Sequence, residues 1–188
     1  MKVVLASASP RRKEIFAKIC PAFEIIPAVG EEKAAGEPKE LVKQLAYQKA
    51  REVADRFSED VLVLGSDTVV ALGDRVLGKP RTKEEAKEML SALSGRTHEV
   101  FTGVCFIRVL SGKEEVVVSA VCTEVEFETL SKAQIEAYVA TGSPMDKAGA
   151  YGIQDGGLVK EIRGSFTNVV GLPEELCRQL FETLSAND

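Results

Sequence analysis

The chain has 188 residues, 45% of them hydrophobic, which suits one α/β domain or two small lobes and excludes a disordered chain. Its net charge of −5, from 24 basic and 29 acidic residues, argues against broad attraction to nucleic acid or to a membrane surface. Four cysteines without a C-x-x-C pair, and one histidine, disfavour a zinc site. We therefore interpret the cysteines as small core residues, and we expect a reduced, cytoplasmic protein without membrane spans.

The predicted elements alternate between strands and helices along the chain. In chain order we expect a strand at 2–7, a helix at 10–19, a strand at 23–26, a loop at 28–37, a helix at 38–57 and strands at 61–67, 68–72 and 76–77. A helix at 83–93 follows, then strands at 98–110 and 115–127 around the turn SGKEE, a helix at 132–141, a strand at 158–163 and a helix at 174–184. Capping-box spacing marks two helix starts, at Thr82 and Ser131. This order predicts the α/β class, with a single domain over 1–188 or a smaller lobe at 68–130.

The start of the first predicted helix breaks a local rule. Ser9 and Pro10 are typical of an N-cap and a first helical residue, yet Arg11, Arg12 and Lys13 follow in the first turn. The helix dipole favours acids at that end, so we expect either a bound polyphosphate or a solvated basic helix start. A Walker A pattern is absent, which excludes a P-loop NTPase.

Other charged residues also stand out against their surroundings. Lys49 lies on the apolar side of helix 38–57, where it either serves a site or extends its amine to solvent at the stripe's edge. Asp67 ends the apolar run 61–66, either as a ligand-binding acid or as an ordinary strand-end acid. On pattern alone, the acidic pair Glu31 and Glu32 is more typical of a solvated loop than of a site, and Lys79 beside a proline is typical of a solvated turn.

The segment 142–157 is the longest predicted loop. It holds five glycines together with Asp146, Lys147, Tyr151 and Gln154. Long loops within a compact domain tend to be functional, and glycine allows close approach of the backbone to a ligand.

Six ordered motifs resemble those of the Maf family, also called septum formation proteins. They are LASASPRR near the N-terminus, GSDTVV at 65–70, GKP at 78–80, LSGRTHEVFTGV at 93–104, DKAGAYGIQ at 146–154 and NVVGLP at 168–173. The resemblance implies a nucleoside triphosphate pyrophosphatase that uses Mg²⁺ or Mn²⁺ and releases the monophosphate and pyrophosphate. It also implies a mixed twisted sheet with flanking helices around a deep cleft, related to inosine triphosphate pyrophosphatases. A cytoplasmic protein that is often a homodimer is implied as well.

Carried over residue by residue, the resemblance implies that Asp67 is the catalytic proton acceptor. The other polar residues of the implied cleft are Ser7, Arg12, Glu32, Lys49, Lys79, Asp146 and Lys147. Fixed positive charge and hydroxyl donors suit a polyphosphate, which assigns Ser7, Arg12, Lys49 and Lys79 to the phosphates. Glu32 and Asp67 are the candidate metal ligands, and whether Asp67 acts as base or as metal ligand stays open.

Three positions resemble the branch of the family that hydrolyses dTTP and UTP. They are Arg11, Thr68 and Gln154, and the sequence departs from the family pattern beside the last of them, at QDGG. Alternatives are a pyrophosphatase for a modified purine triphosphate, a phosphatase that releases orthophosphate, and a non-catalytic nucleotide-binding regulator of septum formation. Nucleic-acid binding is disfavoured by the net charge.

Overall fold

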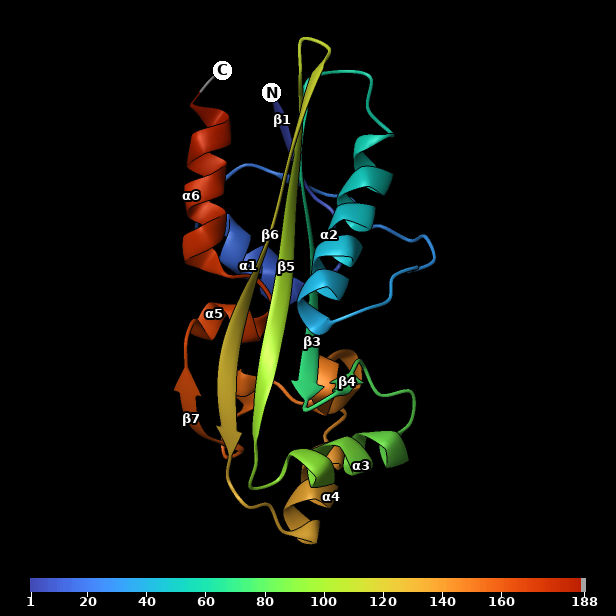
Figure 1. Cartoon of the computed structure of the whole chain (residues 1–188), viewed down its shortest axis with the longest axis vertical. Coiled ribbons are helices and arrows are strands. Elements are labelled where there is room, and N and C mark those ends of the chain that lie inside the picture. The colour runs from blue at the N-terminus through green and yellow to red at the C-terminus, as the bar shows by residue number, and fades with distance from the viewer. Residues whose placement is uncertain (187–188) are drawn as a thin grey trace. The chain divides into compact units, whose positions relative to one another are not determined.

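The computed structural model describes residues 1–186, and within them the strands form one mixed seven-stranded sheet (Figure 1). The strand order is β2-β1-β3-β5-β6-β7, with β4 paired to β3. The strands are β1 (Lys2–Leu5), β2 (Glu24–Ile25), β3 (Val61–Leu72), β4 (Arg75–Leu77), β5 (Thr97–Leu110), β6 (Lys113–Phe127) and β7 (Val159–Arg163). β1 is parallel to β2 and β3, whereas the β3–β4 and β6–β7 pairs are antiparallel.

The helices separate these strands along the chain, as predicted. They are α1 (Pro10–Ala17), α2 (Pro38–Ala54), α3 (Lys83–Leu93), α4 (Lys132–Ala140), α5 (Phe166–Val170) and α6 (Glu174–Ser185). Three short 3₁₀ turns follow α4: η1 (Ser143–Asp146), η2 (Ala148–Ala150) and η3 (Ile153–Asp155). The predicted α/β class, with a mixed sheet and flanking helices, is thereby confirmed.

The described chain divides into two compact units, which we treat separately. Unit 1 comprises residues 1–67, 102–121 and 171 onward, and unit 2 comprises 68–101 and 122–170. The strands β3, β5 and β6 contribute residues to both units. A single domain over the whole chain, with a smaller lobe at 68–130, stays a prediction.

In unit 1, helices pack on both sides of the strands (Figure 1). α2 buries Ala46, Ala50 and Val53 against Val63 of β3 and Ile107 of β5. α1 and α6 pack together, and their aromatic rings meet edge to face with centroids 5.9 Å apart. Side chains alternate between the faces of a strand, so these helices supply the apolar cover that both faces of a buried sheet require.

In unit 2, one apolar core joins α3 and α4 to the strands and to the turns that follow α4. It includes Leu90 of α3, Ile135 of α4, Phe127 of β6 and Tyr151. α4 begins with the predicted capping box between Ser131 and Gln134. At α3 only half of the predicted box forms: the Thr82 hydroxyl accepts from the Glu85 N–H, but the Glu85 carboxylate accepts from the N–H of Arg81 instead.

Several boundaries and one element differ from prediction. The predicted strands 61–67 and 68–72 are the single strand β3, because Val70 to Leu72 pair with Leu77 to Arg75 and the ladder continues past Asp67. α1 and α2 end before the predicted 19 and 57. The β5–β6 turn is only Ser111–Gly112, both with positive φ, and the short helix α5 was not predicted.

The interpretation of every cysteine as a core residue was wrong at one position. Cys20, Cys105 and Cys177 are buried, whereas Cys122 is exposed.

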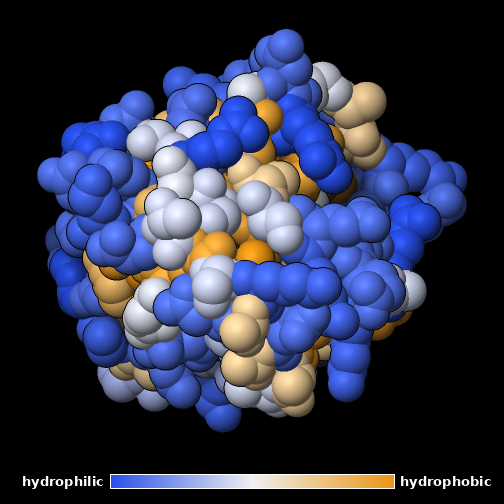
Figure 2. All heavy atoms as spheres, turned by 90° about the horizontal axis from the view of Figure 1, so that it is seen from below, coloured by the Kyte–Doolittle hydropathy of each residue, from blue (hydrophilic) through white to orange (hydrophobic). Residues whose placement is uncertain are grey.

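No helix in the described range 1–186 has both the length and the apolar character needed to cross a membrane. Figure 2 shows one face of the molecule, on which hydrophilic residues surround a smaller central area of hydrophobic ones.

Candidate active site

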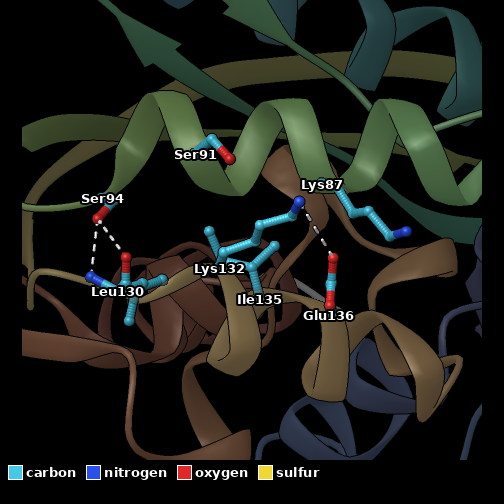
Figure 3. Close-up of a pocket in the computed structure, with 7 residues that line it drawn as sticks. All are labelled: Lys87, Ser91, Ser94, Leu130, Lys132, Ile135 and Glu136. Carbon is cyan, nitrogen blue, oxygen red and sulfur yellow. Dashed lines mark hydrogen bonds and ion pairs between the residues drawn. The ribbon is translucent and has the colours of Figure 1, made fainter.

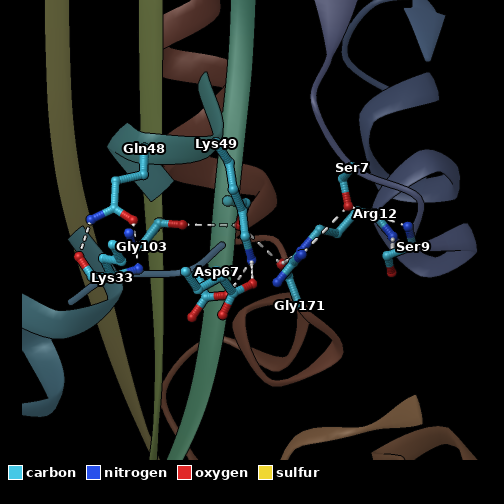
Figure 4. A network of polar contacts seen from close by, with 11 residues as sticks. Ser7, Ser9, Arg12, Lys33, Gln48, Lys49, Asp67, Gly103 and Gly171 are labelled. Atoms are coloured by element: carbon cyan, nitrogen blue, oxygen red, sulfur yellow. Dashed lines mark hydrogen bonds and ion pairs between the residues drawn. The ribbon is translucent and has the colours of Figure 1, made fainter. Parts of the chain in front are cut away.

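Lys49 links two acidic side chains in unit 1. Its Nζ atom lies 2.6 Å from Oδ1 of Asp67 (Figure 4) and 2.8 Å from Oε1 of Glu32. The side chains of Lys49 and Asp67 are only 19% and 12% exposed, whereas that of Glu32 is 56% exposed. Lys49 therefore does not extend to solvent at the edge of the stripe; its charge offsets that of a buried carboxylate.

Asp67 lies within β3 and not at its end, because the strand continues to Leu72. Its position beside Lys49 depends on a close approach of α2 to β3. A Cβ atom on Gly65 would lie 2.3 Å from the Ala46 carbonyl oxygen and 2.7 Å from the Ala50 nitrogen. Only glycine leaves room for that approach, which brings the middle of α2 to the strand two residues before Asp67.

The start of α1 holds a second cation in unit 1. Ser9 is the N-cap and Pro10 the first helical residue, as predicted, and the Ser9 hydroxyl accepts from the Arg12 N–H. Nε of Arg12 donates to the Gly171 carbonyl at 2.8 Å, and Nη1 lies 3.4 Å from the Ser7 hydroxyl (Figure 4). Burial lowers the pKa of Arg12, and the negative charge of Asp67 opposes that shift. Arginine still remains protonated at neutral pH.

The same unit contains a pocket of about 370 Å³ beside this network. It lies between the loop before α2 and α2 itself, and Glu32 and Lys49 both line it. The rest of its lining is Gly30, Glu31, Lys33, Leu45, Tyr47, Gln48, Arg51, Glu52 and Asp55. Unit 1 thus brings together Ser7, Arg12, Glu32, Lys49 and Asp67, and Arg11 lies half-buried in the first turn of α1.

Unit 2 contains the other predicted site residues. Nζ of Lys147 lies 2.9 Å from Oδ1 of Asp146 and donates to the carbonyl oxygen of Ser143 at 2.6 Å. Thr68 is half-buried, and Lys79 and Gln154 are exposed.

Gln154 lies in η3, and two side chains anchor the turns around it. The Tyr138 hydroxyl donates to Oδ2 of Asp155 at 2.5 Å and accepts from the N–H of Gly152 at 3.0 Å. Ser143 donates to the same oxygen of Asp155 at 2.6 Å. Asp155, the residue at which the sequence departs from the family pattern, therefore fixes the loop that carries Gln154.

A buried histidine also belongs to unit 2. His98 is 2% exposed, its Nε2 lies 2.7 Å from the Tyr151 hydroxyl, and its Nδ1 has no hydrogen-bond partner. Burial lowers its pKa to about 4, so the ring is neutral at pH 7. Phe127 and Tyr151 pack edge to face against it.

A second pocket of about 370 Å³ lies against α3 and α4 in unit 2 (Figure 3). On the wall of this pocket, the Ser94 hydroxyl accepts from the Leu130 N–H at 2.7 Å. Nζ of Lys132 lies 4.0 Å from Oε1 of Glu136. Its lining is Lys87, Ser91, Ser94, Leu130, Lys132, Ile135 and Glu136, and none of these is a predicted site residue.

The donor chemistry of the unit 1 network fits a magnesium ion. Mg²⁺ binds oxygen and usually takes one or two carboxylates together with phosphate oxygens and water. Glu32 and Asp67 supply two such carboxylates around one ammonium group. Among residues 1–186, no group of three or more His, Cys, Asp or Glu side chains is arranged to hold a metal by itself.

Sequence reasoning missed the residues that hold the network in place. Gln48 and Glu52 of α2 bind the backbone of the loop that carries Glu32, and the Gly171 carbonyl fixes Arg12. No period or spacing marks such contacts, because each joins a side chain to a distant backbone group. For Gly171, the only signal was the NVVGLP motif.

Comparison with known proteins identifies close relatives over nearly the whole chain. The sequence model of the Maf-like protein family matches residues 2–184. A protein of Thermococcus kodakarensis named dTTP/UTP pyrophosphatase is 51% identical, over 96% of this chain and 95% of its own. Proteins of the same name from Clostridium perfringens and Bacillus cereus are 46% and 47% identical, over 92% and 95% of this chain and 92% and 94% of theirs.

Two solved structures share the fold. The HAM1 protein of Coxiella burnetii matches with a TM-score of 0.57 and 15% identity, and the alignment covers all of both chains. The Ham1 protein of Staphylococcus aureus matches with a TM-score of 0.51 and 16% identity, over 97% of this chain and 99% of its own. At such low identity the likeness concerns the fold alone.

Proposed function

The chain belongs to the Maf-like protein family, and on this basis we propose that it is a nucleoside triphosphate pyrophosphatase that acts on dTTP and UTP. Relatives 46–51% identical over nearly their full length carry the name dTTP/UTP pyrophosphatase, which supports this substrate choice. The structural observation that carries the proposal is the bridge from Lys49 to Asp67 and Glu32, within the same unit as Arg12. Phosphoryl chemistry needs such fixed charges around an acid.

The charges of the network suggest why a divalent cation would be needed. Arg12 and Lys49 carry two positive charges, and Glu32 and Asp67 carry two negative ones, so the four side chains balance. A triphosphate adds about four negative charges at neutral pH and would be repelled by both carboxylates. We propose that Glu32 and Asp67 hold Mg²⁺ or Mn²⁺. When bound, the ion would neutralise phosphate charge and polarise the reacting phosphate.

The proposed reaction is an in-line attack of water on the α-phosphorus. The new bond joins the water oxygen to phosphorus, the bond from phosphorus to the bridging oxygen breaks, and pyrophosphate leaves with that electron pair. Asp67 serves either as the metal ligand named above or as the base that accepts the water proton, and in the first case the proton passes to solvent. Lys49 keeps this carboxylate oriented at 2.6 Å, and Arg12 with Ser7 offers donors to the phosphate oxygens.

The remaining roles rest on the family resemblance. Lys79 is proposed to contact phosphate, and Asp146 and Lys147 are proposed as polar site residues. Arg11, Thr68 and Gln154 are proposed to select the base. The resemblance also supports a cytoplasmic enzyme and a homodimer, and sedimentation tests the dimer. The net charge of −5 argues against a nucleic-acid partner.

A nucleotide panel with Mg²⁺, scored by product, tests the proposal. We expect dTTP and UTP to give the monophosphate and pyrophosphate, and we expect a chelator to abolish the reaction until Mg²⁺ or Mn²⁺ is restored. Release of orthophosphate would indicate a phosphatase instead. No turnover of any triphosphate would favour a binding protein, and undiminished rates in excess chelator would rule out the metal.

A further inference from the structure

An irregular segment in unit 1, residues 29–33, lies along α2, and we call it the strap. It carries Glu32 and contains no helix or strand. Packing does little to hold it, because Val29 is 82% exposed and Glu31 and Lys33 are exposed as well. Whatever fixes the strap must therefore be polar.

Two side chains of α2 bind the strap backbone at both of its ends. The two carboxylate oxygens of Glu52 accept from the N–H groups of Val29 and Gly30, each at 2.9 Å. The Gln48 amide accepts from the N–H of Lys33 at 3.0 Å and donates to the carbonyl oxygen of the same residue (Figure 4). Four hydrogen bonds thus hold the backbone on either side of Glu32.

The spacing of residues on α2 explains how these hydrogen bonds orient Glu32. Gln48 and Glu52 are four residues apart and share one face of the helix. Lys49 follows Gln48 directly. Its ammonium group pairs with the Glu32 carboxylate, with Nζ 2.8 Å from Oε1. Arg56, one turn beyond Glu52, pairs with the Glu52 carboxylate at 2.5 Å. The N–H groups of Val29 and Gly30, and then Arg56, lower the pKa of Glu52, so it stays ionised at neutral pH.

We propose that Gln48 and Glu52 are positioning residues that hold Glu32 in place to receive the divalent cation; this proposal rests on the proposed function. Glu32 is itself 56% exposed and would otherwise sample many conformations. A preorganised ligand binds more tightly because the entropy of ordering it has already been lost on folding. Neither residue touches the substrate or the metal in this account.

The test uses Glu52→Gln, Gln48→Met and the double variant, with Glu40→Gln as the matched control. Glu40 is an exposed acid of the same helix and pairs with Lys43 at 2.9 Å, away from the strap. Glu52→Gln replaces one of two acceptor oxygens by a donor, and Gln48→Met removes both contacts to Lys33. Hydrogen exchange measures how strongly the strap amides are protected by their hydrogen bonds. Mn²⁺ titration followed by electron paramagnetic resonance measures cation affinity without turnover.

We expect exchange at the strap to quicken roughly fivefold or more in each variant, as loss of a hydrogen bond implies. Mn²⁺ binding should weaken by a similar factor, and the Mg²⁺ concentration for half-maximal turnover should rise with it. Turnover at saturating Mg²⁺ should stay within about threefold of wild type, because Asp67, Lys49 and Arg12 are untouched. Glu40→Gln should match wild type in all these measurements.

Two outcomes would overturn the proposal. Exchange as slow as in wild type would mean that these bonds do not hold the strap. Faster exchange with unchanged Mn²⁺ affinity would mean that the strap positions no cation ligand. If the wild-type chain hydrolyses no triphosphate, the proposed function fails, but exchange and Mn²⁺ binding still decide the positioning role.

Discussion

The Lys49 ammonium lies 2.6 Å from the Asp67 carboxylate and 2.8 Å from the Glu32 carboxylate. These three charged side chains therefore form one network. Removing the Lys49 charge takes the nearest cation from the buried Asp67 carboxylate, whereas removing either carboxylate leaves the ammonium group paired with the other one. The chemical role of each residue is therefore best tested by substitutions that keep the shape and change only the charge.

Asp67→Asn is the most informative of these substitutions. It keeps the size of the side chain but removes the negative charge that a proton acceptor or a metal ligand needs. We expect turnover to fall at least ~100-fold, as for loss of a general base, with the circular dichroism spectrum unchanged. A variant that keeps more than about a tenth of wild-type turnover would contradict the assignment.

Gln154 is exposed in η3 and is the proposed selector of the base. An amide can accept from N3–H of thymine or uracil and donate to O4 at once, but flipped it also fits cytosine. Arg11, which only donates, is the candidate for rejecting cytosine, with a penalty of roughly 1–3 kcal/mol, or about 5- to 150-fold.

We accordingly expect kcat/KM for dTTP and UTP well above that for CTP, with ATP and GTP lower still. Gln154→Glu brings an acceptor-only group to the base edge and should erode the preference. Competition assays with paired nucleotides measure the ratios directly. A purine triphosphate as best substrate would refute the base assignment while leaving the pyrophosphatase chemistry intact.

His98 gives a prediction about pH and stability. Its pKa is about 4 in the folded protein and about 6.5 in an unfolded chain, so the unfolded state binds a proton that the folded state excludes. Its contribution to stability is complete above pH 6.5 and is lost as the pH falls toward 4, at about 1.4 kcal/mol per pH unit.

Urea unfolding of wild type and His98→Gln across this range measures the effect. The free energies of unfolding of the two proteins should converge as the pH drops from 6.5 to 4, because glutamine does not titrate. Curves that stay parallel would show that His98 is as easily protonated in the folded state as in the unfolded chain.

Among the secondary-structure elements, the contact of α2 with β3 matters most to the site. α2 supplies Lys49, Gln48 and Glu52, and β3 supplies Asp67. The distance between the two elements is set at Gly65, where a Cβ atom would lie 2.3 Å from a helix carbonyl oxygen. A shift of α2 would move the amine and the strap together, away from the carboxylate.

Gly65→Ala should therefore lower both stability and activity. Overpacking of this kind costs about 1–3 kcal/mol, and the backbone atoms that it meets cannot rotate away. Gly78→Ala is the matched control, since a Cβ atom there meets nothing within 4 Å. Thermal melts of both variants measure the difference, and equal melting temperatures would mean that α2 has room to move.

For the whole molecule, local signals predicted much of the fold. Ser9–Pro10, Ser131–Gln134 and the alternating apolar runs gave helix starts and strands close to those observed, because caps and periodicity act within a few residues. The single strand β3 was missed because its continuation past Asp67 depends on pairing with β4. α5 was missed because five residues are too few for a helical period.

The candidate site was predictable only in part, for the same reason. The family resemblance nominated Ser7, Arg12, Glu32, Lys49 and Asp67. In unit 1, Lys49 pairs with Glu32 and Asp67, and Arg12 contacts Ser7. Their supports are contacts between a side chain and a remote backbone group, such as Glu52 with Gly30, and no sequence spacing encodes them. Tyr138, whose hydroxyl donates to the Asp155 carboxylate, escaped prediction because this contact between two side chains also joins residues distant in sequence.

The central claim is attack of water at the α-phosphorus of dTTP, and one isotope experiment tests it directly. The wild-type chain is incubated with dTTP and Mg²⁺ in ¹⁸O-water, and the masses of the products are determined by mass spectrometry. The account predicts one ¹⁸O atom in dTMP, none in pyrophosphate and no orthophosphate. Label in pyrophosphate, or release of labelled orthophosphate with dTDP, would contradict it.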